Sequence, residues 1–392
     1  GAVLLRELHT NDKIGNVAGM NTLKNPAEQI IERFGGQSQL AGLLGKGQST
    51  VQHWAKTARI PAQWHKRLLE LAREKGIALE PKDFMSSEAP AIESAEGKLG
   101  VMLVGLGAVS STFIAGVEHI RRGTGQPVGS ISQMATIRIG KRTDGESPLI
   151  RDFAPLASLD QLVFGAWDPI ADDAYEAAIK AGVLDRHEEI EPVADFLKSI
   201  KPIPAVFDQD YVKRIEGVNV KTAPTKLQLV EAIREDMRRF KAANGCDRLV
   251  MIWCASTEKF ITEAEIHQDI ESLLGGFEDN SENIAPSMIY AYAALLEGVP
   301  FANGAPNLAV DIPVFEKMAK DNGVPICGKD FKTGQTLVKT VIGPMIKARM
   351  LGMDGWFSTN ILGNRDGEVL DEPENFKTKE ESKLGVLEHI LQ

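Results

Sequence analysis

The sequence has few cysteines, few aromatic residues and no excess of positive charge. Its 392 residues include 3 cysteines and 6% aromatic residues, and the formal net charge is -10 at pH 7. The cysteines (Cys246, Cys254 and Cys327) are too few and too scattered for a disulfide framework, and no pair has metal-ligand spacing. The negative charge argues against a chain that binds nucleic acid along its whole length, although one small basic module remains compatible with it.

Long apolar runs are also missing, as are a signal peptide and a lipidation motif, so we expect a soluble protein in a reducing cytoplasm. The rest of the composition, with 43% hydrophobic and 25% charged residues, is ordinary for a globular protein of two or three domains. The chain starts at Gly1, with Met20 as a candidate natural start, and it stops at Gln392 directly after an apolar helical pattern. We therefore expect the segment of residues 361–392 to be truncated.

Residues 20–86 are expected to form a small all-α domain. An apolar face around Leu40, a glycine turn at residues 45–47 and a second helix with Trp54 resemble the helix-turn-helix of Cro/repressor-type and antitoxin-type DNA-binding domains. That resemblance implies that residues 37–57 contact DNA through the second helix. A helical protein-interaction module is the alternative. The residues that would face DNA are Gln48, Ser49, Thr50, Gln52, His53 and Lys56.

Residues 87–97 are small, polar and acidic and are expected to be a linker. An apolar strand then runs into a turn with Gly105 and Gly107, and a helix starts there. This arrangement is typical of a dinucleotide site, where the turn and the helix N-terminus bind pyrophosphate. The third glycine of the usual pattern is replaced by Ser110, so an ordinary strand–helix turn stays open as an alternative. The predicted cofactor-binding residues of this turn are Gly105, Gly107, Ala108, Val109 and Ser110.

Two later strands end in polar residues. Asp168 follows an apolar strand, where an adenosine ribose would be held, and its distance from the glycine turn requires an insertion at about residues 121–159. Ala255, Ser256 and Thr257 follow a further strand and fit a crevice at the carboxyl ends of strands. All four residues are predicted to bind the cofactor.

Lysines cluster near the C-terminus among Gly, Thr, Asn and Asp. Lys379 and Lys383 are four apart, so on a helix they would share one face; the others are Lys332 and Lys339. Converging ammonium groups suit a phosphorylated or enolate-forming substrate, because they neutralise charge that develops during the reaction. A solvated basic face is the alternative.

Residues 98–392 resemble the inositol-3-phosphate synthase (myo-inositol-1-phosphate synthase) family. The resemblance keeps its order through a series of long motifs: GLGAVSS, IWCASTEKF, IAPSMIYAYAALLEGVPFANGAPN, KDFKTGQTLVKT, STNILGNRDG and FKTKEESKLGVLEHIL. It implies an isomerase that uses bound NAD to oxidise glucose 6-phosphate at C5. Enolisation, aldol closure of C6 onto C1 and re-reduction then give an inositol phosphate for inositol and inositol-lipid synthesis.

The resemblance also implies roles for individual residues. Lys332 would stabilise the enolate or alkoxide and transfer protons, while the other three lysines would bind phosphate or polarise the C1 carbonyl. Asp330 and Asp366 would orient the lysines. Asn303, Asn360 and Asn364 would bind the substrate. A Lys at position 329 and an Ala at position 305 depart from the family pattern.

The expected architecture is α/β: a Rossmann-like NAD domain (98–254) and an inserted α+β domain (255–360) that is catalytic and forms a homotetramer. Residues 361–392 are expected to return toward the NAD domain. Two other functions stay open. One is a DNA-binding regulator whose synthase-like part senses NAD or sugar phosphate, and the other is a sugar-phosphate dehydrogenase that releases NADH.

Overall fold

The computed structural model describes residues 25–57, 60–61, 64–79, 83, 96–154, 156–331, 334–357 and 364–391. The chain divides into two compact units, Gly1–Glu93 and Ser94–Gln392. None of the described helices is long and apolar enough to cross a lipid bilayer.

The first unit is all-α in its described part. Asn25 caps its first helix by accepting a hydrogen bond from the amide of Glu28, whose side chain bonds back to the Asn25 amide. Leu40, Trp54 and Leu68 are buried in a common core. The turn between the second and third helices contains Gly45 in the left-handed conformation (φ 61°). The helices are α2 (Pro26–Arg33), α3 (Gln37–Leu44), α4 (Gln48–Lys56) and α5 (His65–Glu74). The predicted pair of helices around a glycine turn is therefore present.

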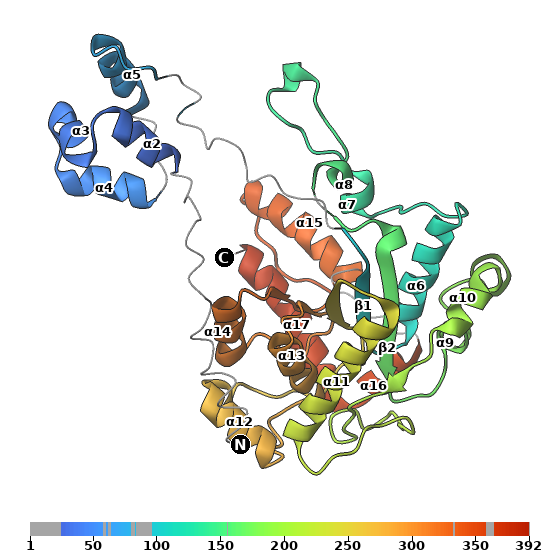
Figure 1. Cartoon of the computed structure of the whole chain (residues 1–392). Coiled ribbons are helices and arrows are strands. Elements are labelled where there is room, and N and C mark those ends of the chain that lie inside the picture. The colour runs from blue at the N-terminus through green and yellow to red at the C-terminus, as the bar shows by residue number, and fades with distance from the viewer. Residues whose placement is uncertain are drawn as a thin grey trace. The chain divides into compact units, whose positions relative to one another are not determined.

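The second unit is built on a six-stranded parallel sheet within the described residues (Figure 1). The strands are β1 (Leu99–Val104), β2 (Leu162–Asp168), β3 (Ile203–Pro204), β4 (Arg248–Trp253), β5 (Phe301–Asn303) and β6 (Ile326–Cys327). Their order, β3-β2-β1-β4-β5-β6, is that of the doubly wound dinucleotide-binding fold. The predicted α/β Rossmann-like fold is confirmed.

Helices lie on both faces of the sheet and cover separate hydrophobic cores. One core lies between the sheet and α6 (Ala108–Arg121), α9 (Ala174–Ala181) and α10 (Ala194–Ser199). The other involves α11 (Lys226–Asn244), α12 (Ile270–Glu278), α13 (Pro286–Leu296) and α14 (Pro313–Asn322). The C-terminal helices are α15 (Gly334–Ala348), α16 (Asn364–Leu370) and α17 (Pro373–Leu391).

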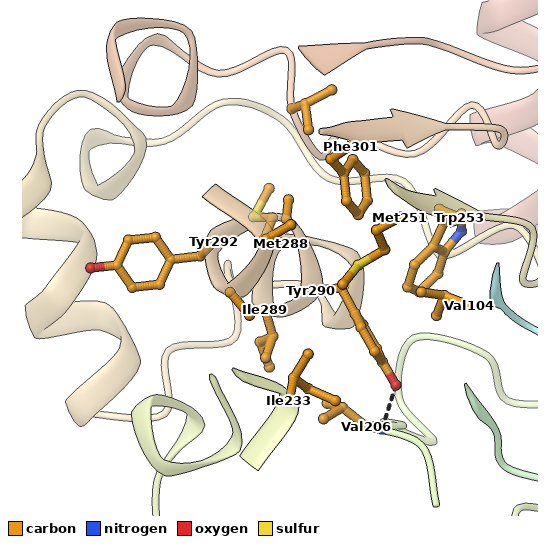
Figure 2. Close-up of a cluster of buried hydrophobic side chains, with 14 of the residues drawn as sticks. Val104, Val206, Ile233, Met251, Trp253, Met288, Ile289, Tyr290, Tyr292 and Phe301 are labelled. Atoms are coloured by element: carbon orange, nitrogen blue, oxygen red, sulfur yellow. Dashed lines mark hydrogen bonds between the residues drawn. The ribbon is translucent and has the colours of Figure 1, made fainter. Parts of the chain in front are cut away.

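The buried centre of the second core is α13, which is apolar on nearly every side and almost entirely buried. Tyr290 of this helix packs edge-on against Trp167 and Trp253, which lie at the carboxyl ends of β2 and β4. Its hydroxyl oxygen accepts a hydrogen bond from the Val206 amide at 2.8 Å, as Figure 2 shows. The hydrogen bond satisfies the hydroxyl, which is the one polar group of a side chain that otherwise lies in an apolar environment.

The predicted insertion between the glycine turn and Asp168 is present as short elements between α6 and β2. They are α7 (Ile131–Met134), η3 (Arg142–Asp144), α8 (Ile150–Phe153) and η4 (Leu159–Gln161). The remaining short helical turns are η5 (Arg186–Ile190), η6 (Glu191–Val193) and η7 (Glu265–His267).

The sheet does not agree with a separate inserted domain at residues 255–360. β5 and β6 lie inside that range, yet they extend the nucleotide-binding sheet, with Met251 pairing with Phe301 and Phe301 with Ile326. Phe301 is buried in the same core as the central strands, so hydrophobic burial favours continuation of the sheet. The homotetramer implied by the resemblance stays a prediction.

Candidate active site

A cavity of about 440 Å³ opens at the carboxyl ends of β1, β2 and β4. In a doubly wound sheet this is where ligands bind, because the strand order reverses there and leaves a crevice. The described residues that line it include Gly105, Gly107, Ala108, Val109, Asp168, Ala255, Ser256, Thr257, Glu258, Asp330, Arg365, Asp366 and Lys379. The cavity thus brings the predicted cofactor residues, except Ser110, together with three of the predicted catalytic ones.

The glycine turn forms one wall of the cavity. Gly105 has φ +95°, and a Cβ added to it would lie 2.6 Å from Cα of Ala255, so no other residue fits between the turn and the loop after β4. Gly107 is the N-cap of α6, and a Cβ there would meet no atom within 4 Å. The Ser110 hydroxyl donates to the Gly105 carbonyl at 2.5 Å and so closes the turn from inside. The wall therefore offers open space directly at a helix N-terminus, as a pyrophosphate needs.

Asp168 is fixed at the end of β2 by backbone amides. Its carboxylate oxygens accept hydrogen bonds from Leu106 at 2.6 Å and from Ile170 at 2.8 Å. Burial raises the pKa of this carboxyl above its usual value, although both amide bonds act in the opposite direction. Each oxygen still has acceptor capacity for a ribose hydroxyl. A second cavity of about 80 Å³, lined partly by Asp168, Gly107 and Arg365, adjoins this position.

The predicted lysine cluster divides into two groups. The Lys379 ammonium lies 3.3 Å from the Asp330 carboxylate, and both residues line the cavity together with Asp366. Lys339 of α15 instead donates to the backbone carbonyl of Lys383 in α17 at 2.9 Å, and burial lowers its pKa. The pKa of Lys383 is also lowered, first by burial and then by the nearby charge of Lys379. Among the described residues, Lys339 and Lys383 are not part of the cavity lining.

Asn303 and Thr257 are buried and hold neighbouring backbone, while their predicted roles in binding substrate and cofactor stay predictions. The Asn303 amide donates to the Asn307 carbonyl at 2.9 Å and its oxygen accepts from the Ala305 amide at 3.1 Å, so it shapes the loop that leads to Asp330. Thr257 presents its carbonyl to Asn375 at 2.7 Å. Lys332, Asn360 and the side chain of Asn364 lie outside the described residues.

Residues 99–384 match the family model of myo-inositol-1-phosphate synthase, which is an NAD-binding family. The chain belongs to this family. It is 52% identical over 303 residues to inositol-3-phosphate synthase 1 of Bacteroides thetaiotaomicron, which covers 77% of this chain and 70% of the relative. Identity to inositol-3-phosphate synthase isozyme 1 of Arabidopsis thaliana is 35%, over 75% of this chain and 60% of the relative.

Among solved structures, the inositol-3-phosphate synthase of Caenorhabditis elegans superposes with a TM-score of 0.69 at 27% identity, covering 74% of this chain and 60% of that one. This member of the synthase family thus spans about 60–70% of the length of these relatives. The predicted family is confirmed.

NAD fits the residues that this synthase-family member presents. Gly107 leaves room at the α6 N-terminus where a Cβ would otherwise project, and Asp168 lies at the ribose position after β2. Small side chains at Ala255 and Ser256 border the same cavity. The family and these features agree on the cofactor.

Glu258 is a site residue that the sequence reading missed. It lines the cavity, is only 2% exposed, and accepts from the Ser287 hydroxyl at 2.5 Å and from the Ser287 amide at 3.0 Å. Burial raises the pKa of its carboxyl to about 7, while both bonds to Ser287 act in the opposite direction. The signal in the sequence was a charged residue directly after the small polar residues that end β4.

Replacing Glu258 with glutamine is expected to make stability less dependent on pH. The folded-state pKa of this carboxyl is raised to about 7 from 4.5, so its protonated form is favoured and stability falls as pH rises between these values. A glutamine side chain is neutral at every pH and can still form a hydrogen bond with Ser287. Relative to wild type, Glu258→Gln should gain free energy of unfolding through this window, by roughly 3 kcal/mol above pH 7. Urea unfolding at several pH values measures the difference, and a constant difference would contradict the prediction.

Proposed function

We propose that this chain is an inositol-3-phosphate synthase that converts glucose 6-phosphate to an inositol phosphate. The observation that carries the proposal is the Lys379–Asp330 pair, which lies on the same cavity as the dinucleotide turn. A cofactor cavity alone would suit many oxidoreductases. An ammonium and two carboxylates beside it suit a reaction in which negative charge develops on carbon and oxygen.

The net reaction is an isomerisation. C5 of the open-chain sugar loses a hydride and its hydroxyl loses a proton, and the resulting ketone acidifies the hydrogens at C6. The C6 enolate then attacks the C1 aldehyde and forms the ring bond, and hydride returns to C5. NAD, when bound, supplies the hydride acceptor and donor, so none is consumed overall.

The residues of the chain act around these steps. The Lys379 ammonium would stabilise the oxyanion formed during enolisation or aldol closure, and Asp330 would hold it in place. Asp366 is a further carboxylate on the cavity wall. Lys332 is proposed to transfer protons, as the resemblance implies. Lys339 is buried and Lys383 is half-buried, and burial lowers the pKa of both, which favours the neutral amine over the ammonium.

The test is inositol phosphate formation from glucose 6-phosphate with NAD+, followed by phosphorus NMR while absorbance at the NADH wavelength is recorded. Because the chain spans only part of its relatives' length, any longer polypeptide that its gene encodes is assayed as well. Product without accumulating NADH supports the synthase. Steady NADH release would show a dehydrogenase instead, and no product from either polypeptide would reject the synthase.

We propose DNA binding as a second function, located in the first unit. The exposed positions of α4 are Gln48, Ser49, Gln52, His53 and Lys56, and the helix contains no acidic residue. Lys46, in the turn before it, lies 5.3 Å from the Trp64 ring centroid. An acid-free helix face with amide and basic groups suits the major groove, where both bases and phosphates are contacted.

Binding of the whole chain to a random-sequence DNA duplex should weaken as salt rises, since phosphate contacts release counterions. Lys56→Ala should lower the affinity and reduce the slope of its salt dependence by about one, as expected for one lost phosphate contact. Lys75→Ala, at the exposed end of α5, is the matched control. Fluorescence anisotropy measures both, and no binding at low salt would leave only a protein-interaction role for this unit.

A further inference from the structure

The two members of the Lys379–Asp330 pair come from distant parts of the chain. Lys379 is on α17, whereas Asp330 follows β6 in a loop, and φ of Asp330 is +67°. Their side chains are 18% and 5% exposed. Two segments that are 49 residues apart must therefore be held against each other by buried contacts.

The backbone of Glu258 connects both segments. Its N–H donates to Oδ1 of Asn307 at 2.8 Å, and its carbonyl accepts from the Thr378 hydroxyl at 2.9 Å. All three residues are buried, at 2%, 1% and 5% exposure. The N–H and the carbonyl of Glu258 thus bond to the two segments that carry Asp330 and Lys379.

On the Asp330 side the connection continues through the asparagine loop. The Asn307 carbonyl accepts from the Asn303 amide at 2.9 Å, and the carbonyls of Asn303 and Ala305 accept from the Asp330 N–H at 3.2 and 3.0 Å. The loop between β5 and Asp330 is therefore fixed by side-chain and backbone bonds.

On the Lys379 side the connection is shorter. Thr378 precedes Lys379 directly, and Asn375, one turn earlier on α17, donates to the carbonyls of Thr257 and Tyr211 at 2.7 and 2.9 Å. These contacts tie the first turns of α17 to the loop after β4 and to the segment between β3 and α11. The hydrogen bonds form a ring that is closed by the peptide bond between Thr378 and Lys379. Its members are Glu258, Asn307, Asn303, Asp330, Lys379 and Thr378.

We propose that Thr378 and Asn307 are positioning residues that set the approach of the Lys379 ammonium to Asp330 through the backbone of Glu258. The proposal rests on the synthase function proposed above. Neither side chain is among the described residues that line the cavity, so both act through the pair and not on the substrate. Buried hydrogen bonds suit this task, because water does not compete for their donors and acceptors.

Thr378→Val removes the hydroxyl and keeps the shape of the side chain, while Thr378→Ser keeps the hydroxyl. The valine variant should lose about tenfold or more in kcat, since small displacements of a catalytic group have large effects on rate. Its KM for NAD should stay unchanged, and serine should restore kcat. Asn307→Leu removes the oxygen that accepts from the Glu258 N–H. This variant should likewise lose kcat and keep the KM for NAD.

Lysine acylation gives a readout that does not depend on turnover. Treatment with acetic anhydride followed by peptide mass spectrometry compares Lys379 with Lys377, an exposed lysine of the same helix. In Thr378→Val the ratio of Lys379 to Lys377 labelling should rise several-fold, because the ammonium is no longer held at Asp330, and in Thr378→Ser it should stay at the wild-type ratio. If the valine variant does not accumulate as a folded protein, Thr378→Ala takes its place.

The outcomes separate this proposal from the proposed function. Absence of product from wild-type protein would reject the synthase, and the labelling ratio would still decide the positioning role. An unchanged labelling ratio in the valine and alanine variants would overturn the positioning role, as would wild-type kcat in an active synthase. Equal losses in kcat and NAD affinity, not restored by serine, would show a merely structural role.

Discussion

Replacing Lys379 with methionine is expected to lower the rate of inositol phosphate formation by at least about a hundredfold, as loss of one preorganised oxyanion-stabilising group does. Lys379 is the described lysine that lines the cavity and pairs with Asp330 at 3.3 Å. Methionine keeps the unbranched chain but removes the charge. NAD affinity should change little, because the glycine turn and Asp168 are untouched. Phosphorus NMR of the product and calorimetric titration of NAD measure the two effects.

Lys377→Met is the matched control for this substitution. Lys377 is on the same helix, is exposed, and places its ammonium 4.3 Å from the Phe260 ring centroid instead of in the cavity. The same chemical change there should leave the rate within about twofold of wild type. Wild-type turnover in Lys379→Met would show that Lys379 takes no part in the reaction.

Loss of Lys379 also leaves the buried Asp330 without this ion-pair partner. Removing one partner of a buried hydrogen-bonded pair typically costs about 1–3 kcal/mol. Asp330→Asn in the Lys379→Met background should recover part of that stability without recovering activity. This combination separates a catalytic loss from a loss of folded protein.

Site residues could be predicted from the sequence where a chemical requirement and a local backbone geometry fall on the same few residues. Gly105, Gly107 and Asp168 could be predicted, because a strand, a tight turn and a helix follow one another within a few residues and each position has a steric or polar requirement. The strands in 255–360 could not be assigned to a sheet. β5 and β6 have only three and two residues, too few to show a period, and their partners are fixed by tertiary packing.

The side-chain roles were harder to predict than the residue types. Helical spacing correctly placed Lys379 and Lys383 on one helix, but it could not show that Lys339 donates to a carbonyl of that helix. The sequence could not show that Asn303 holds its loop, because this depends on the positions of Asn307 and Ala305. Glu258 was overlooked because its partner, Ser287, is 29 residues away.

Replacing Gly105 with alanine is expected to affect both stability and NAD binding. Its φ of +95° disfavours any side chain, and the new Cβ would lie 2.6 Å from the backbone of Ala255, which cannot move without displacing the loop after β4. We expect the free energy of unfolding to fall by about 2 kcal/mol or more, as for other strained or overpacked sites. NAD affinity should fall at least tenfold, since the turn and the loop both border the cavity.

Two other glycines of the same strand–helix unit separate these effects. Gly116, exposed within α6, has no atom within 4 Å of an added Cβ, so Gly116→Ala should raise stability by about 0.5–1 kcal/mol and leave NAD affinity unchanged. Gly107→Ala should leave stability near wild type but weaken NAD, because its Cβ would project into the space kept for the pyrophosphate. Thermal unfolding and calorimetric titration of the three variants measure both quantities. Wild-type stability and NAD affinity in Gly105→Ala would contradict the close contact between the glycine turn and Ala255.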